Sequence, residues 1–154
     1  MMNLKNSLSG RFSNKILLRV MAIIALIGVA DTAYLTADYY FGTGVQCLLL
    51  EGCKVVLTSS YSVIMGIPLV VFGLVFYTVI FILVNLTDLY GGRFFQKILA
   101  LVGVAGFVAS LFFLYLQVFV IGELCFYCLV SLGSSTSIFI LAALFSRNLK
   151  LASV

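Results

Sequence analysis

Four long apolar stretches, separated by shorter polar segments, dominate the pattern along this chain. They cover about residues 16–39, 63–86, 98–121 and 124–146. A helix of about 20 apolar residues spans the ~30 Å hydrocarbon core of a bilayer, so each stretch predicts a transmembrane helix. None of them alternates apolar and polar residues with period two, as the strands of a membrane barrel do. The pattern therefore predicts an all-α integral membrane protein built as a four-helix bundle.

The composition agrees with a membrane protein and argues against a soluble domain. The 154 residues have a mean hydropathy of +1.26 and only 9% are charged, whereas soluble domains carry roughly a quarter charged residues. The first apolar stretch is longer than the usual ~7–15-residue core of a signal peptide, and no small-x-small cleavage site follows, so we expect a retained helix. No lysine-rich run or aromatic–basic interleaving suggests a nucleic acid as partner.

The positions of lysine and arginine predict the orientation. Eight of them lie near the ends of the chain or between the second and third stretches: Lys5, Arg11, Lys15, Arg19, Arg93, Lys97, Arg147 and Lys150. Only Lys54 lies in the loop 42–62. The positive-inside rule then places both termini in the cytoplasm and that loop outside it. We expect a cytoplasmic tail over 1–15, a membrane domain over 16–146 with the redox loop 42–62, and a cytoplasmic tail over 147–154.

All four cysteines lie where an apolar stretch meets a polar connection on the outward side. Cys47 and Cys53 belong to the loop, whereas Cys125 and Cys128 open the last stretch as Cys-Phe-Tyr-Cys. Cysteines three residues apart share a helix face and can form a disulfide. The dipole at the start of the helix is expected to favour the thiolate of Cys125. Thiol–disulfide exchange between a mobile loop pair and a fixed pair would make an electron relay.

Such a relay needs a two-electron acceptor, and the sequence holds no nicotinamide fingerprint, haem-attachment motif or iron–sulfur spacing. The expected acceptor is therefore a lipid-soluble quinone held among apolar and aromatic side chains. Phe113 and Tyr115 lie near the cysteine end and are candidates to line its site. Two other interpretations of the cysteines stay open, a four-thiolate zinc site and unreactive buried thiols.

Three further features lie close to these cysteines. Asp31 falls within the first apolar stretch, where a carboxylate is a candidate functional group; the favoured interpretation is that it braces the bundle through hydrogen bonds. The hydroxyl-rich run 58–62, which includes Ser59, is suited to capping the start of a helix. Pro68 is expected in the first turns of the second helix, where a missing N–H matters least.

Five short motifs spread over residues 28–134 carry a resemblance to a known family. They are Asp31-x-x-Tyr34-Leu35-Thr36, Cys47-x5-Cys53, Val56-Leu57-x-Ser59-x-Tyr61, Gly66-Ile67-Pro68 and Cys125-x-x-Cys128. This combination resembles the vitamin K epoxide reductase family in its prokaryotic form. The resemblance implies a four-helix bundle around a quinone of the ubiquinone, menaquinone or vitamin K type, located in a prokaryotic plasma membrane.

The resemblance also implies roles for individual residues. Cys128 would lie nearest the quinone, and Cys125 would exchange with Cys53. Cys47 would react with a thioredoxin-like or DsbA-like extracytoplasmic protein. Ser59 matches the family's hydroxyl near the active site. Many prokaryotic relatives carry a fused thioredoxin-like domain that this sequence lacks, so we expect the partner to be a separate protein.

The predicted function is a thiol–quinone oxidoreductase that supports disulfide bond formation. One alternative is reduction of vitamin K epoxide or quinone by the same thiols. Leu132 weakens that alternative, because it stands where the vertebrate enzymes of the family have a tyrosine one turn after the second active-site cysteine. A non-enzymatic membrane scaffold with structural disulfides is the alternative of another class.

Overall fold

The computed structural model describes residues 2–42, 52–91 and 93–152. Its long helices are α1 (Met2–Phe41), α3 (Leu69–Tyr90), α4 (Arg93–Tyr115) and α5 (Phe126–Ala152). The segments of these helices that are long and apolar enough to cross a membrane are Asn14–Phe41, Leu69–Tyr90, Arg93–Ile121 and Phe126–Asn148. The predicted all-α, four-helix membrane bundle is therefore confirmed.

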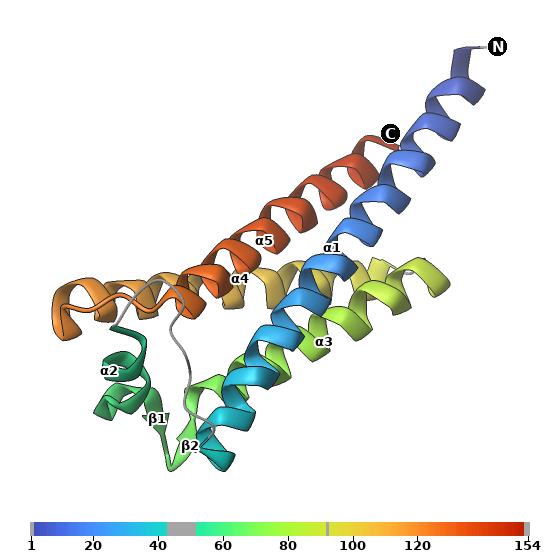
Figure 1. The fold of residues 1–154 in the computed structure, drawn as a ribbon. Helices are drawn as coiled ribbons and strands as arrows, with labels where there is room; N and C mark the ends of the chain where they lie inside the picture. Colours follow the sequence, from blue (N-terminus) through green and yellow to red (C-terminus); the bar gives the residue numbers. More distant parts are fainter. Residues whose placement is uncertain (1, 43–51, 92, 153–154) are drawn as a thin grey trace.

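Short elements cover one end of the bundle (Figure 1). They are helix α2 (Gly52–Thr58), a 3₁₀ turn (Ser60–Ser62) and the strands β1 (Val63–Ile64) and β2 (Ile67–Pro68). The start of α1 and the end of α5 lie together at the opposite end of the molecule, where the amide of Asn148 donates to Asn14 at 3.3 Å. The bundle thus has a capped end, which carries the cysteines, and an end that carries both chain termini.

The second membrane helix begins later than the apolar pattern predicts. Residues 63–68 form a tight antiparallel hairpin, in which Val63 pairs with Pro68. The two turn residues, Met65 and Gly66, both have positive φ, at 53° and 84°, as the common two-residue hairpin turn requires. Pro68 keeps the residue before it out of helical geometry, and it precedes the helix as its N-cap. The expectation that Pro68 lies inside the first turns was therefore wrong by one residue.

The end of the bundle that carries the termini is solidly packed. Its core consists of buried apolar side chains from all four long helices: Leu18, Met21, Ala25, Tyr77, Ile80, Leu83, Val84, Leu99, Ile138, Ala142 and Phe145. Glycines let aromatic rings approach a neighbouring backbone closely. The ring of Tyr77 lies directly on Gly28, and that of Phe76 lies on Gly106. Beyond this packed region, the helices surround a cavity at the capped end.

Candidate active site

The described cysteines converge at the capped end of the bundle. Cys53 lies in the first turn of α2, Cys125 immediately precedes α5, and Cys128 lies in the first turn of α5. Cys53 and Cys125 are fully buried in one cluster with Val56, and Cys128 packs against that cluster. The Cys125 thiol lies close enough to interact with the side chains of both Cys128 and Cys53. Cys47 lies outside the described residues, so its predicted role stays a prediction.

The backbone holds Cys125 in place from both sides. Its carbonyl accepts the N–H of Leu129 at 3.1 Å, which makes Cys125 the N-cap of α5. Its own N–H donates to Oε1 of Gln117 at 2.9 Å. The sequence placed Cys125 one residue further in, within the first turn, because the helix was expected to begin at about residue 124. As the N-cap, Cys125 is fixed by hydrogen bonds from two elements.

The electrostatics of the cysteine pair differ from the sequence-based expectation. The hydrogen bond to Cys128, burial, and the charge of Cys128 together raise the pKa of the Cys125 thiol. Their direction is opposite to the expected effect of the helix dipole, which favours a Cys125 thiolate. The Cys125 thiol is therefore harder to ionise than a free cysteine. Cys128 differs from Cys125 in that its side chain reaches the cavity.

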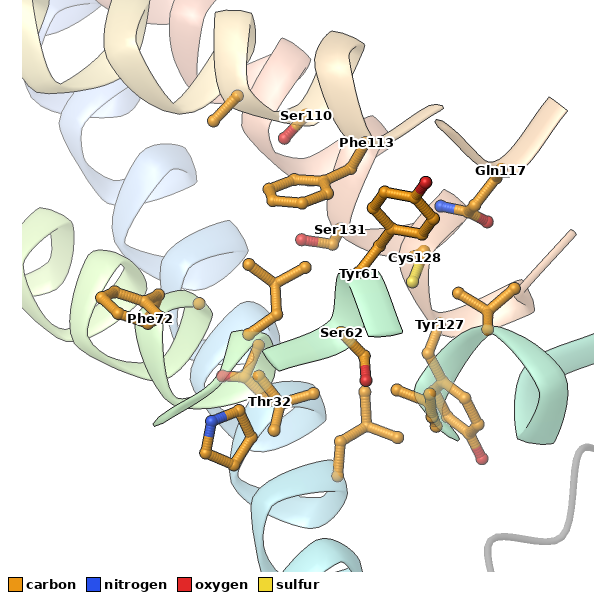
Figure 2. A pocket seen from close by; sticks show the side chains of 18 of the residues that line it. Thr32, Tyr61, Ser62, Phe72, Ser110, Phe113, Gln117, Tyr127, Cys128 and Ser131 are labelled. Atoms are coloured by element: carbon orange, nitrogen blue, oxygen red, sulfur yellow. The ribbon is translucent and has the colours of Figure 1, made fainter. Parts of the chain in front are cut away.

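A cavity of about 770 Å³ lies next to the thiol cluster. Its volume falls in the range of about 300–1,000 Å³ that is typical of cofactor and ligand sites. The wall includes Cys128 from α5, whereas Cys53 and Cys125 are buried behind it. Figure 2 shows side chains from several elements around the same space, among them Phe113, Gln117 and Tyr61. Cys128 is thus the described cysteine that connects the buried thiols with the cavity.

The predicted lining residues have different outcomes. Phe113 and Ser59 line the cavity. Tyr115 is not among the described residues of its wall; its ring packs against Phe119, with centroids 5.1 Å apart, and is half exposed. Each helical residue turns by about 100°, so positions 113 and 115 point to nearly opposite sides of α4.

Ser59 has a local hydrogen bond that the sequence did not predict. Its hydroxyl donates to the carbonyl of Val56 at 2.8 Å, at the end of α2. The hydroxyl makes no side-chain cap bond to the following 3₁₀ turn. The expectation that this hydroxyl-rich run caps the start of a helix was therefore wrong for Ser59. The hydroxyl instead closes the short helix that carries Cys53.

Asp31 lines the cavity from α1. One of its carboxyl oxygens, Oδ2, is buried and has no hydrogen-bond partner among the described residues. At this oxygen, the structure does not support the interpretation that Asp31 braces the bundle through hydrogen bonds. A buried polar atom without a partner faces a desolvation penalty, so Asp31 is a polar group available to the cavity.

Two polar residues of the site that the sequence did not indicate come from α3 and from the segment after α4. Gln117 is buried in the cavity wall. The hydroxyl of Tyr77 donates to the carbonyl of Ser131 at 2.8 Å and lies 2.9 Å from its hydroxyl, one turn beyond Cys128. A glutamine and a tyrosine inside apolar stretches are the signal that could have identified both, because intramembrane polar groups usually face the protein interior.

Comparison with known proteins gives matches over the region that contains this site. Residues 19–143 match the family described as "Vitamin K epoxide reductase family". Over 125 residues the chain is 39% identical to "Thiol-disulfide oxidoreductase LTO1" of Arabidopsis thaliana. The matched region covers 73% of this chain and 32% of the plant protein. The chain thus matches about a third of the length of that relative. From the extent of the family match, this chain belongs to the vitamin K epoxide reductase family.

Proposed function

We propose that this protein is a membrane thiol–quinone oxidoreductase. It oxidises the dithiol of a thioredoxin-like protein outside the cytoplasm, reduces a lipid-soluble quinone and supports disulfide bond formation. The observation that carries the proposal is the position of Cys128, which packs on the buried thiol cluster and forms part of the cavity wall. The name of the plant relative, a thiol-disulfide oxidoreductase, agrees with this class of chemistry.

The electrons pass through two disulfides in sequence. The partner's dithiol reduces the Cys47–Cys53 disulfide, and the thiolate of Cys53 then attacks the sulfur of Cys125. The contact between the Cys53 and Cys125 side chains supports this order. The attack breaks the Cys125–Cys128 bond and releases Cys128 as a thiolate at the cavity. The thiol of Cys47 then attacks Cys53 in the resulting Cys53–Cys125 disulfide, which releases Cys125 and re-forms the Cys47–Cys53 disulfide for the next partner. The reduced Cys125–Cys128 pair now holds two electrons.

The cavity fits a quinone by its chemistry. Its walls are mainly apolar and include aromatic rings such as Phe72 and Phe113, which suit a planar ring and an isoprenoid chain. A quinone of the ubiquinone, menaquinone or vitamin K type accepts two electrons and two protons. Both electrons come from the Cys125–Cys128 dithiol, which becomes a disulfide again, and the dithiol's two protons balance the reaction.

The proposed location follows from the distribution of positive charge. Eight of the nine lysines and arginines lie outside the loop 42–62, which by the positive-inside rule puts that loop outside the cytoplasm. The location of α2 at the end of the bundle opposite the chain termini agrees with this arrangement (Figure 1). The resemblance to the prokaryotic form of the family places the protein in a prokaryotic plasma membrane, and the charge distribution makes both termini cytoplasmic and the partner extracytoplasmic.

The test is quinone reduction by the purified full chain with a reduced thioredoxin-like protein as donor. The wild-type protein should reduce a short-chain quinone at a rate that depends on both substrates, followed by the absorbance change of the quinone. Cys128→Ser should abolish turnover, whereas Tyr115→Phe, on the outer surface of the bundle, should not change it. If the wild-type Cys125–Cys128 bond stayed oxidised in the presence of the reduced donor, the scaffold alternative would replace this proposal.

A further inference from the structure

Gln117 occupies an unusual place in the backbone, in the segment that directly follows α4. The segment Leu116–Ile121 is a π-helix that continues α4. It ends at Gly122, whose N–H donates to the carbonyl of Gln117 at 2.9 Å, five residues back. Turns of this kind are rare and frequently mark functional sites. This one brings a buried glutamine to the cavity wall.

The hydrogen bond to Cys125 fixes the orientation of the Gln117 amide. A backbone N–H can donate only to the amide oxygen, so Oε1 must face Cys125, at 2.9 Å. The amide nitrogen then points the opposite way. Figure 2 shows it directed toward the side of the cavity where Tyr61 and Cys128 lie. Among the described residues, no acceptor bonds this nitrogen.

The Gln117 side chain is buried in the cavity wall, and its amide nitrogen faces the cavity, where a carbonyl oxygen of a ligand would supply the acceptor it lacks. On the basis of the function proposed above, we propose that Gln117 binds a carbonyl oxygen of the quinone through its amide nitrogen, beside Cys128. Gln117 transfers no proton or electron itself. Its hydrogen bond becomes stronger as negative charge develops on that oxygen during reduction.

The same side chain also bonds the backbone of Cys125. Gln117 would therefore hold the quinone ring and the cysteine pair in one fixed relation. Such positioning matters because a reacting pair of atoms must approach within about 3–3.5 Å in a defined orientation. A glutamine that only bonded Cys125 would not affect the preference for a quinone over a hydrocarbon of the same shape. Ligand selectivity therefore distinguishes the two roles.

The first test compares two ligands on the oxidised, full-length protein in detergent. One is a short-chain 1,4-naphthoquinone; the other is the matching alkylnaphthalene, which lacks both ring oxygens. Gln117→Met should weaken binding of the quinone about 5- to 10-fold, the loss of one hydrogen bond, and leave the alkylnaphthalene unchanged. Gln96→Met is the matched control, because Gln96 lies at the other end of α4 and bonds the carbonyl of Gly91. It should change neither affinity.

A second measurement uses the wild-type side chain and does not depend on the variant folding. The sequence has three glutamines, Gln46, Gln96 and Gln117, so Gln46→Met and Gln96→Met together leave one side-chain amide signal in ¹⁵N-glutamine-labelled protein. That signal should shift with the naphthoquinone and not with the alkylnaphthalene. An amide signal that responds equally to both ligands, or to neither, would overturn the contact.

The outcomes also separate this contact from the proposed function. Selective quinone binding through Gln117 in a wild-type protein that never reduces quinone would refute the function and leave the contact in place. Normal quinone turnover in the wild type, together with a Gln117→Met variant that discriminates between the two ligands as well as the wild type does, would refute the contact and leave the proposed function in place. Equal weakening of both ligands in Gln117→Met would show a distorted cavity and also overturn it.

Discussion

Replacing Tyr77 by phenylalanine removes one oxygen from the centre of the bundle. The Tyr77 side chain is fully buried, and its hydroxyl joins α3 to α5 by donating to the carbonyl of Ser131 at 2.8 Å. Phenylalanine keeps the ring on Gly28, so the packing between α1 and α3 should remain. The substitution therefore isolates the link between two helices, on the α5 turn that follows Cys128.

The magnitude can be worked out from the groups that lose a partner. The carbonyl of Ser131 belongs to a continuous helix, so it keeps its backbone hydrogen bond in the variant. The variant loses only the second hydrogen bond to this carbonyl, the one that the Tyr77 hydroxyl donates. Hydrogen bonds between membrane helices average about 0.6 kcal/mol and reach about 1.7 kcal/mol. We expect Tyr77→Phe to lower the free energy of unfolding by about 0.5–1.5 kcal/mol.

Reversible unfolding in mixed micelles, followed by far-ultraviolet circular dichroism, measures this change. Tyr90→Phe is the matched control, since Tyr90 ends the same helix and is exposed; it should change the free energy of unfolding by less than about 0.5 kcal/mol. A Tyr77→Phe protein as stable as the wild type would show that the hydroxyl does not join the helices. A loss above about 3 kcal/mol would mean that the packing had also changed.

Four further predictions concern the packing and the cysteine relay. Gly28→Ala should lower the free energy of unfolding by about 1–3 kcal/mol, because the added Cβ overlaps the Tyr77 ring, whereas Gly133→Ala, with open space around it, should be neutral or stabilising in the same measurement. Cys128→Ser should accumulate a Cys53–Cys125 disulfide in non-reducing peptide maps; a dominant Cys47–Cys125 species would reverse the loop roles. Ser59→Ala should lose about 1 kcal/mol of stability through the bond to Val56, and quinone turnover slowed by roughly 10- to 100-fold would indicate that the hydroxyl also binds the reacting groups. A membrane-impermeant thiol reagent, applied to intact cells after reduction, should label Cys47, and labelling that requires lysis would contradict the outward placement.

The sequence predicted the membrane helices well because each one corresponds to a long apolar stretch, and such a stretch has a direct physical reason to span a bilayer. Twenty consecutive apolar residues have few alternatives to a spanning helix, and the described structure has spans close to each predicted stretch. The start of the second helix was missed because apolar residues continue through the hairpin at 63–68, so hydropathy alone does not mark the boundary. Backbone geometry at Met65 and Gly66 sets it instead.

Within the site, the sequence identified residue types better than their directions. Aromatic character alone predicts both Phe113 and Tyr115 as lining residues, although helical periodicity places them on different sides of α4. The local bond of Ser59 could not be predicted, because a serine after a short helix can cap either neighbour. Gln117 was overlooked because its importance depends on a backbone irregularity, which brings its side chain to Cys125.

The π-helix at Leu116–Ile121 has a consequence for how such a protein can change over generations. A π-turn contains one residue more than the α-helical turn it replaces. Deleting one codon between positions 118 and 121 would restore regular helical bonding and rotate the following chain by about 100° relative to Gln117. The amide of Gln117 would then no longer meet Cys125. The one additional residue of the π-helix therefore maintains the link between the cavity and the cysteines.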